Sequence, residues 1–126
     1  MKINSGVILN TRHQAILWNG SSLSLWGENQ KPSVMAEGVE DIKFLTACPD
    51  GKHFAFWSES EESFRLMDIT GKEIWRCRVN ADKKTPYGTH FSASGDAVAF
   101  IYDYDHSYCI YLYELGKKHA TEIISG

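Results

Sequence analysis

The feature that most constrains this chain is a repeat within its own sequence. Residues 48–56 read Cys-Pro-Asp-Gly-Lys-His-Phe-Ala-Phe and residues 92–100 read Ser-Ala-Ser-Gly-Asp-Ala-Val-Ala-Phe, which places Ala99 44 residues after Ala55. Residues 11–17 give a weaker first copy, in which Ala15 takes the place of Ala55. A period of roughly 40 residues is typical of chains that stack similar units, each burying its apolar face against the next.

Each copy belongs to a unit of four short apolar runs separated by turn-forming residues. The runs are rich in β-branched and aromatic residues, the turns contain Gly, Asp, Asn or Pro, and no window shows a helical period. The sequence therefore predicts an all-β chain of twelve strands. We expect a single domain, 1–126, with repeat units at approximately 6–37, 42–79 and 88–125.

The second unit carries the most specific motif. Its residues 49–56, Pro-Asp-Gly-Lys-His-Phe-Ala-Phe, followed by 64–68, Phe-Arg-Leu-Met-Asp, resemble the blade repeat of TolB-type β-propellers. The layout is also similar to WD-repeat blades, although the Gly-His and Trp-Asp dipeptides of those blades are missing. The resemblance implies three four-stranded antiparallel propeller-type blades, a half-propeller. A β-sandwich built from the same strands is the alternative fold.

Three blades are too few for a closed ring, because closed propellers contain four to eight. The resemblance therefore implies an open half-propeller, a homodimer that completes a six-bladed ring, or a variant that caps its open sides in another way.

Composition limits the classes of partner. The net charge of -3 removes the usual electrostatic reason to bind nucleic acid or an anionic membrane, and no apolar run approaches the ~20 residues of a membrane span. Cys48, Cys77 and Cys109 are odd in number and widely spaced, which argues against a disulfide framework and a zinc ribbon. No secretory h-region precedes the first unit, so we expect a cytoplasmic protein.

Residues that would carry chemistry are sparse. Asp103, Asp105 and His106 place two carboxylates and an imidazole within four positions, which allows a hydrolase or lyase site. A polar hairpin between two strands is the simpler interpretation. No nucleophile motif or phosphate-binding glycine loop is present, so we expect no enzymatic activity, no metal and no cofactor.

Charge is divided between the two ends of the predicted sheets. In a meander of strands a, b, c and d, the b-to-c and d-to-a loops share one end, and the other loops share the opposite end. The first end carries nine acidic residues against Lys83 and Lys84, whereas the opposite end carries Arg12 and five lysines against four acidic residues. The acidic residues of the first end are Glu37, Glu40, Asp41, Glu59, Glu61, Glu62, Asp82, Asp103 and Asp105.

This division predicts a non-enzymatic protein-binding module whose acidic loop face binds and neutralises a basic partner. A cytosolic immunity protein that inhibits a nuclease-type toxin is the setting that fits best. The partner-binding residues would be Glu37, Glu40, Asp41, Glu59, Glu61, Glu62, Asp103 and Asp105. A self-associating propeller scaffold is the alternative within the binding class, and the site around Asp103, Asp105 and His106 is the enzymatic one.

Overall fold

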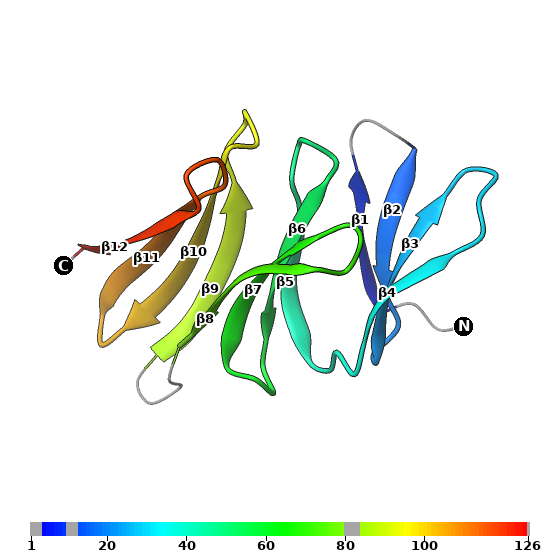
Figure 1. Ribbon diagram of the computed structural model, residues 1–126. Coiled ribbons are helices and arrows are strands. Elements are labelled where there is room, and N and C mark those ends of the chain that lie inside the picture. The colour runs from blue at the N-terminus through cyan, green and yellow to red at the C-terminus, as the bar shows by residue number, and fades with distance from the viewer. Residues whose placement is uncertain (1–3, 10–12, 80–83, 126) are drawn as a thin grey trace.

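The computed structural model describes residues 4–9, 13–79 and 84–125, and these residues form strands joined by turns (Figure 1). The strands are β1 (Ser5–Leu9), β2 (Gln14–Trp18), β3 (Ser22–Gly27), β4 (Ser33–Glu37), β5 (Ile42–Ala47), β6 (His53–Ser58), β7 (Ser63–Asp68), β8 (Glu73–Arg78), β9 (Lys84–Phe91), β10 (Ala97–Tyr104), β11 (Ser107–Glu114) and β12 (His119–Ser125). Within the described ranges, no helix is long and apolar enough to cross a membrane.

The strands form three separate four-stranded sheets, each an antiparallel meander in chain order. The sheets are β1–β4, β5–β8 and β9–β12, which confirms the predicted all-β fold with three propeller-type blades. β9 begins at Lys84, so the third sheet starts four residues before the expected start of its repeat unit. The strands therefore lie in three consecutive sheets instead of the two facing sheets of a sandwich.

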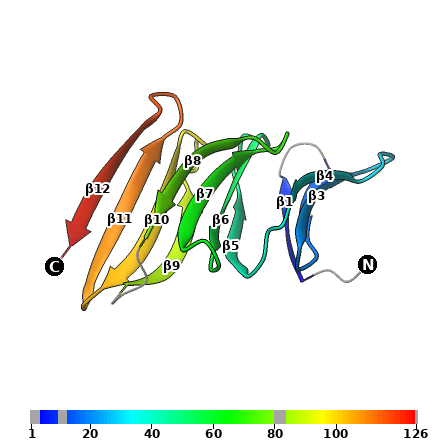
Figure 2. The same cartoon turned by 60° about the horizontal axis from the view of Figure 1, so that its bottom comes forward.

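The three sheets stack side by side, with β5–β8 between the other two (Figures 1 and 2). The first strands of neighbouring sheets are in contact, β1 with β5 and β5 with β9. The hydroxyl groups of Thr46 on β5 and Thr89 on β9 form a hydrogen bond across this contact, with their oxygens 2.8 Å apart. The sheets β1–β4 and β9–β12 are consequently the two outer sheets of an open stack.

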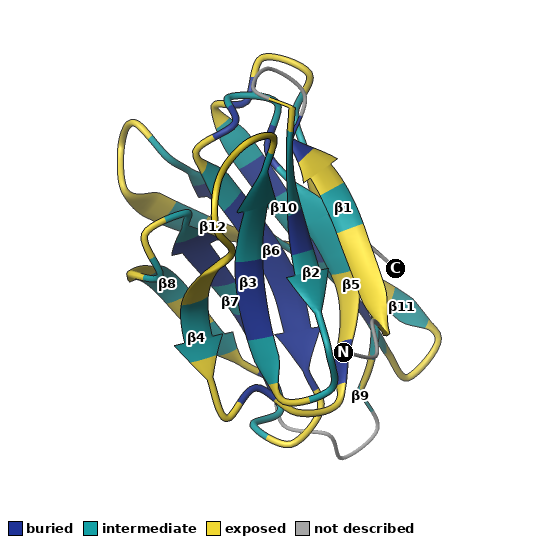
Figure 3. Ribbon diagram, turned by 90° about the vertical axis from the view of Figure 1, so that its right-hand side faces the viewer, coloured by how far each residue is buried: buried dark blue, intermediate teal, exposed yellow. Residues whose placement is uncertain are grey.

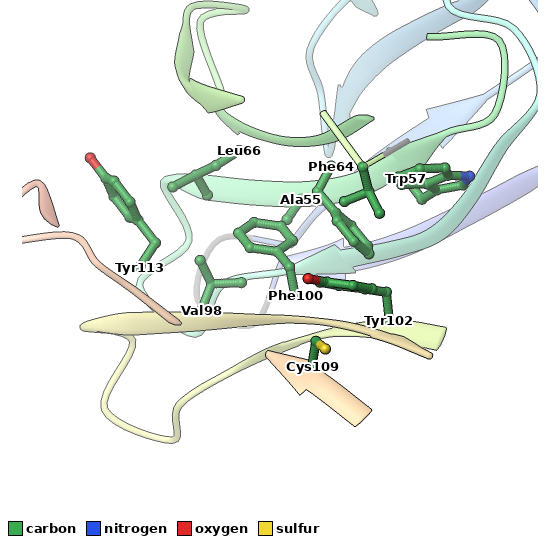
Figure 4. Close-up of a cluster of buried hydrophobic side chains, with 10 residues drawn as sticks. Ala55, Trp57, Phe64, Leu66, Val98, Phe100, Tyr102, Cys109 and Tyr113 are labelled. Carbon is green, nitrogen blue, oxygen red and sulfur yellow. The ribbon is translucent and has the colours of Figure 1, made fainter. Parts of the chain in front are cut away.

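Two hydrophobic cores hold the stack together. Between the second and third sheets, Trp57, Phe64 and Leu66 pack against Val98 and Phe100 (Figure 4). The first and second sheets meet through a separate cluster that includes Leu9, Ile16, Leu23, Phe54, Phe56 and Met67. β6 supplies residues to both cores and is buried along most of its length (Figure 3). Its unbroken apolar run reflects this burial on both faces.

Tight turns connect the strands where the motif predicts them. The chain reverses between β5 and β6 at Gly51, whose φ of 71° is a left-handed conformation that glycine adopts without steric cost. Gly71 also has a positive φ of 96°, and a Cβ atom there would collide with the carbonyl oxygen of Met35 on β4. Glycine is therefore needed where a turn of the second sheet touches the first.

The first copy of the repeat is displaced by one residue from the alignment expected from sequence. Ile16, not Ala15, faces the next sheet as Ala55 does, since Ile16 packs in the core between the first and second sheets. His53, two residues before Ala55, therefore corresponds to Gln14, whereas the alignment of Ala15 with Ala55 places it at His13. The expected alignment was wrong because this copy lacks the Pro-Asp-Gly turn that anchors the second one.

Candidate protein-binding end

The b-to-c and d-to-a loops gather at one end of the stack, the lower end in Figure 1. We call this the acidic end. It comprises residues 19–21, 38–41, 59–62 and 105–106 together with the strand ends that flank them. Asp82 and Lys83 belong to this end in the sequence-based prediction but lie outside the described residues, as Arg12 of the opposite end does.

Glu37, Glu40 and Asp41 lie where the first sheet passes to the second, and all three are exposed. The loop is held in place from below, because Val39 and Ile42 are buried in the core between these sheets. Its backbone is also tied to the next loop, since the Glu59 amide donates to the carbonyl oxygen of Asp41 at 3.0 Å. The three carboxylates thus project from a fixed loop.

Asp103 and Asp105 lie on the hairpin between β10 and β11. Tyr104 pairs with Ser107, so Asp105 and His106 form a two-residue turn, and their φ angles of 48° and 70° are those of a type I′ turn. Asp105 is exposed and Asp103 is half-buried. Across the described part of the chain, no hydrogen bond or ion pair joins Asp103, Asp105 and His106. Asp105 and His106 thus occupy the two positions of a tight turn, where positive φ angles are required.

The three glutamates of the β6–β7 loop are engaged within the chain. The indole nitrogen of Trp57 donates to Glu59 at 2.6 Å, and the Lys43 ammonium lies 3.9 Å from the same carboxylate. Glu62 pairs with Arg78 at 3.7 Å. These contacts reduce the negative charge that the loop presents to a partner.

Glu61 belongs to a four-residue ion network. Arg65 and Arg76 are direct neighbours on β7 and β8, and their like charges would repel without a bridge. Glu61 accepts from Arg65 at 3.2 Å and from Arg76 at 2.7 Å, and Glu73 accepts from the same two side chains at 2.8 and 2.9 Å. Burial raises the pKa of Glu73, but the hydrogen bonds from the two arginines outweigh burial and hold it below its ordinary value. The carboxylate of Glu61 is therefore engaged in ion pairs within the second sheet.

Strand-borne basic residues were missed by the loop-based sequence reasoning. Lys43, Arg76 and Arg78 lie inside strands, so a count of loop charges omits them, although the antiparallel register brings them near the acidic loops. Lys84 was counted, and its ammonium lies over the rings of Tyr102 and Tyr104 at 5.6 and 5.5 Å. Among the residues that the structure describes, the acidic-end carboxylates without an ion pair are Glu37, Glu40, Asp41, Asp103 and Asp105.

A second cluster, at the opposite end, was not singled out from sequence. The ligating atoms of Cys48, Asp50 and His53 all lie within 4.8 Å of one another. Burial raises the pKa of the Cys48 thiol to about 12, which keeps it protonated at neutral pH. Asp50 accepts from the backbone amides of Lys52 and His53 and lies 2.6 Å from the His53 ring.

The corresponding turn of the third sheet shows what this cluster does. Ser92 and Ser94 donate to Asp96 there, and the backbone bond from Ser92 to Ala97 matches the one from Cys48 to His53. In both turns, polar side chains are hydrogen-bonded around the same reversal of the backbone. The hydrogen bonds of Asp50 therefore stabilise the turn between β5 and β6.

Comparison with known proteins yields a similarity of fold. No family model matches the chain, and no curated protein matches it. Among solved structures, the chain is similar to TolB from Acinetobacter baumannii, with a TM-score of 0.51 and 18% sequence identity. The match covers 90% of this chain and 27% of the TolB chain. The predicted resemblance to propeller blades is confirmed at the level of the fold.

Proposed function

We propose that this chain is a non-enzymatic protein-binding module that docks a basic protein on its acidic end. The observation that carries the proposal is the gathering of five carboxylates without an ion pair, Glu37, Glu40, Asp41, Asp103 and Asp105, at one end of the described stack. The proposed site is narrower than the sequence-based one, because Glu59, Glu61 and Glu62 are committed to partners within the chain.

The physical case rests on rigidity and charge. The carboxylates sit on short loops anchored by buried neighbours, so they do not have to be ordered when a partner binds. Segregated negative charge steers a positively charged protein into register and raises its association rate, and this effect falls with ionic strength. The opposite end carries Lys52, Lys72 and Lys118, which form no ion pair among the described residues and further orient an approaching basic surface.

A nuclease-type toxin is the partner class that fits this chemistry best. A nuclease must present a basic surface to the phosphate backbone of its substrate, and a fixed array of carboxylates competes for that same surface. In this proposal the chain acts as an immunity protein in the cytoplasm and neutralises the toxin by covering its substrate-binding face.

The test compares charge reversals at the two ends. The double variant Glu37→Lys/Glu40→Lys removes acidic-end charge at exposed positions, and Glu28→Lys makes the same kind of change on an exposed turn at the opposite end. Immobilised wild-type protein and each variant are used to capture proteins from the native cells at low salt. The captured protein is then purified and titrated against each variant. We expect the double variant to associate more slowly than the wild-type chain, by roughly 3- to 10-fold for each of its two reversed residues. Glu28→Lys should leave the association rate unchanged.

The purified partner also allows a measurement of inhibition. If the captured protein is a nuclease, wild-type chain should inhibit cleavage of DNA or RNA, and the double variant should need a higher concentration to do so. Equal capture by the wild-type and double-variant proteins, or equal weakening by Glu28→Lys, would remove the acidic end from the mechanism.

A further inference from the structure

The strand pairing sets one register for the three units. Ile16, Ala55 and Ala99 occupy the same place on β2, β6 and β10. Each lies between one partner on the preceding strand and one on the following strand. The partners are Val7 and Leu25 for Ile16, Thr46 and Leu66 for Ala55, and His90 and Leu112 for Ala99. We call the sheet face that carries these residues the forward face, and the other face the backward face.

The forward faces of the first two sheets are covered, whereas that of the third is open. Ile16, Ala55 and Leu66 are each 0% exposed, because the next sheet packs on them. On the third sheet, Leu112 is only half-buried and Ile123 is 45% exposed. The third sheet therefore presents the same kind of apolar packing surface with no sheet on top of it.

The backward faces show the reverse pattern. Phe56 on the second sheet and Phe100 on the third are 0% exposed, since each faces the preceding sheet. Their counterpart on the first sheet, Leu17, lies on the open side, beside Ile8 at 75% exposure and Val34 at 56%. The first sheet thus has an open backward face.

The open backward face is also concave. A hollow of about 420 Å³ lies on it, lined in part by Ile8, Ala15 and Trp26. A concave, largely apolar surface leaves room for side chains of another sheet.

We propose that a second copy of this chain covers both open faces. The forward face of β9–β12 in each copy packs on the backward face of β1–β4 in the other, and the two contacts are related by a two-fold axis. The ring that results has six blades, which is within the range of closed propellers. The contact continues, with the same pair of faces, the two interfaces that already exist inside each chain.

Sedimentation velocity over a concentration series tests the proposal. The wild-type chain should sediment with twice its 14.3 kDa mass. Ile8→Glu places a charge on the backward face and Ile123→Glu on the forward face, and each should weaken the dimer by at least ~100-fold, because an unpaired charge is buried at both contacts. Tyr104→Glu is the matched control, since Tyr104 is 44% exposed and lies at the acidic end, outside the two open faces.

Mixing the two variants separates this arrangement from others. A mixture of Ile8→Glu and Ile123→Glu chains contains one undamaged contact per pair, so a 1:1 dimer should reappear although neither variant dimerises alone. A dimer through two like faces would respond to one variant only and would not be rescued. A monomeric wild type at every concentration, or assemblies larger than a dimer, would overturn the two-fold ring. Circular dichroism of each variant verifies that it is folded.

Discussion

Leu66 and Leu112 occupy the same place in two successive units of one chain, yet their surroundings differ. Leu66 is covered by the third sheet and is fully buried, whereas Leu112 lies on the open face of that third sheet. The residue type and the strand position are the same in both cases. The difference therefore comes from the neighbouring sheet and not from the local sequence.

This comparison shows where the stability of such an array resides. A single four-stranded sheet buries little on its own, and the apolar area that leaves water lies between sheets. The second sheet is buried on both faces, and the first and third on one face each. We therefore expect the second sheet to unfold last and the end sheets to open first.

The largest effect is expected from the same substitution at the two equivalent leucines. Leu66→Ala should cost about 2–5 kcal/mol of unfolding free energy, because it leaves a cavity in the core between the second and third sheets. Leu112→Ala should cost under about 1 kcal/mol in the monomer, since water already reaches this face. Urea unfolding at low protein concentration measures both.

The protein concentration supplies the control for this pair. When the concentration is raised, the loss caused by Leu112→Ala should grow if a second copy covers the face, and the loss caused by Leu66→Ala should not change. Equal losses for the two variants at low concentration would contradict the contrast between the covered and the open face.

The fold was predictable from the sequence because its signals are local and repeated. Short runs of β-branched and aromatic residues, punctuated by turns such as Asp50-Gly51, specify strands and their meander, and the 44-residue offset between Ala55 and Ala99 specifies equivalent units. The first unit lacks such a turn. Its alignment was therefore one residue out, which exchanges the buried and the open face of a strand.

The candidate site was predictable only in part, because charge depends on contacts across strands. The sequence places Glu59, Glu61 and Glu62 in one loop, but it does not show that Lys43, Arg76 and Arg78 are carried to that loop by pairing of β5 and β8 with their neighbours. Glu40 and Asp105 lie on turns and form no ion pair with a lysine or arginine among the described residues, so they stay in the proposed site.

A smaller effect is expected from the turns that begin the second strand of each sheet. Asp50 accepts two backbone amides and contacts His53, whereas Ser94 in the third sheet bonds only to exposed side chains. Asp50→Ala should therefore cost about 1–2 kcal/mol and Ser94→Ala under about 0.5 kcal/mol in urea unfolding. Asp50→Asn keeps the acceptor oxygen and should restore most of the loss. A Ser94→Ala variant as unstable as Asp50→Ala would show that the two turns contribute alike.

The smallest effect concerns charge on the second sheet, where Arg65 and Arg76 occupy the places taken by Tyr111 and Glu122 on the third. Although burial raises the pKa of Glu73, its bonds to these arginines lower it below the ordinary value of 4.5. A lowered pKa in the folded state contributes stability that is complete above that ordinary value and is lost as the pH falls through the folded-state pKa.

Glu73→Gln should therefore lower the unfolding free energy at pH 7 by less than ~1 kcal/mol, because the network is partly exposed and screened by solvent. Below about pH 4 the difference between Glu73→Gln and wild type should shrink. Asp50, Asp68 and Asp96 also have lowered pKa values and continue to destabilise both proteins in acid, so only the difference between the two curves reports on Glu73. Urea unfolding from pH 7 to pH 3 measures it, and a difference that stays constant over this range would mean that the network stabilises the second sheet by packing and not by charge.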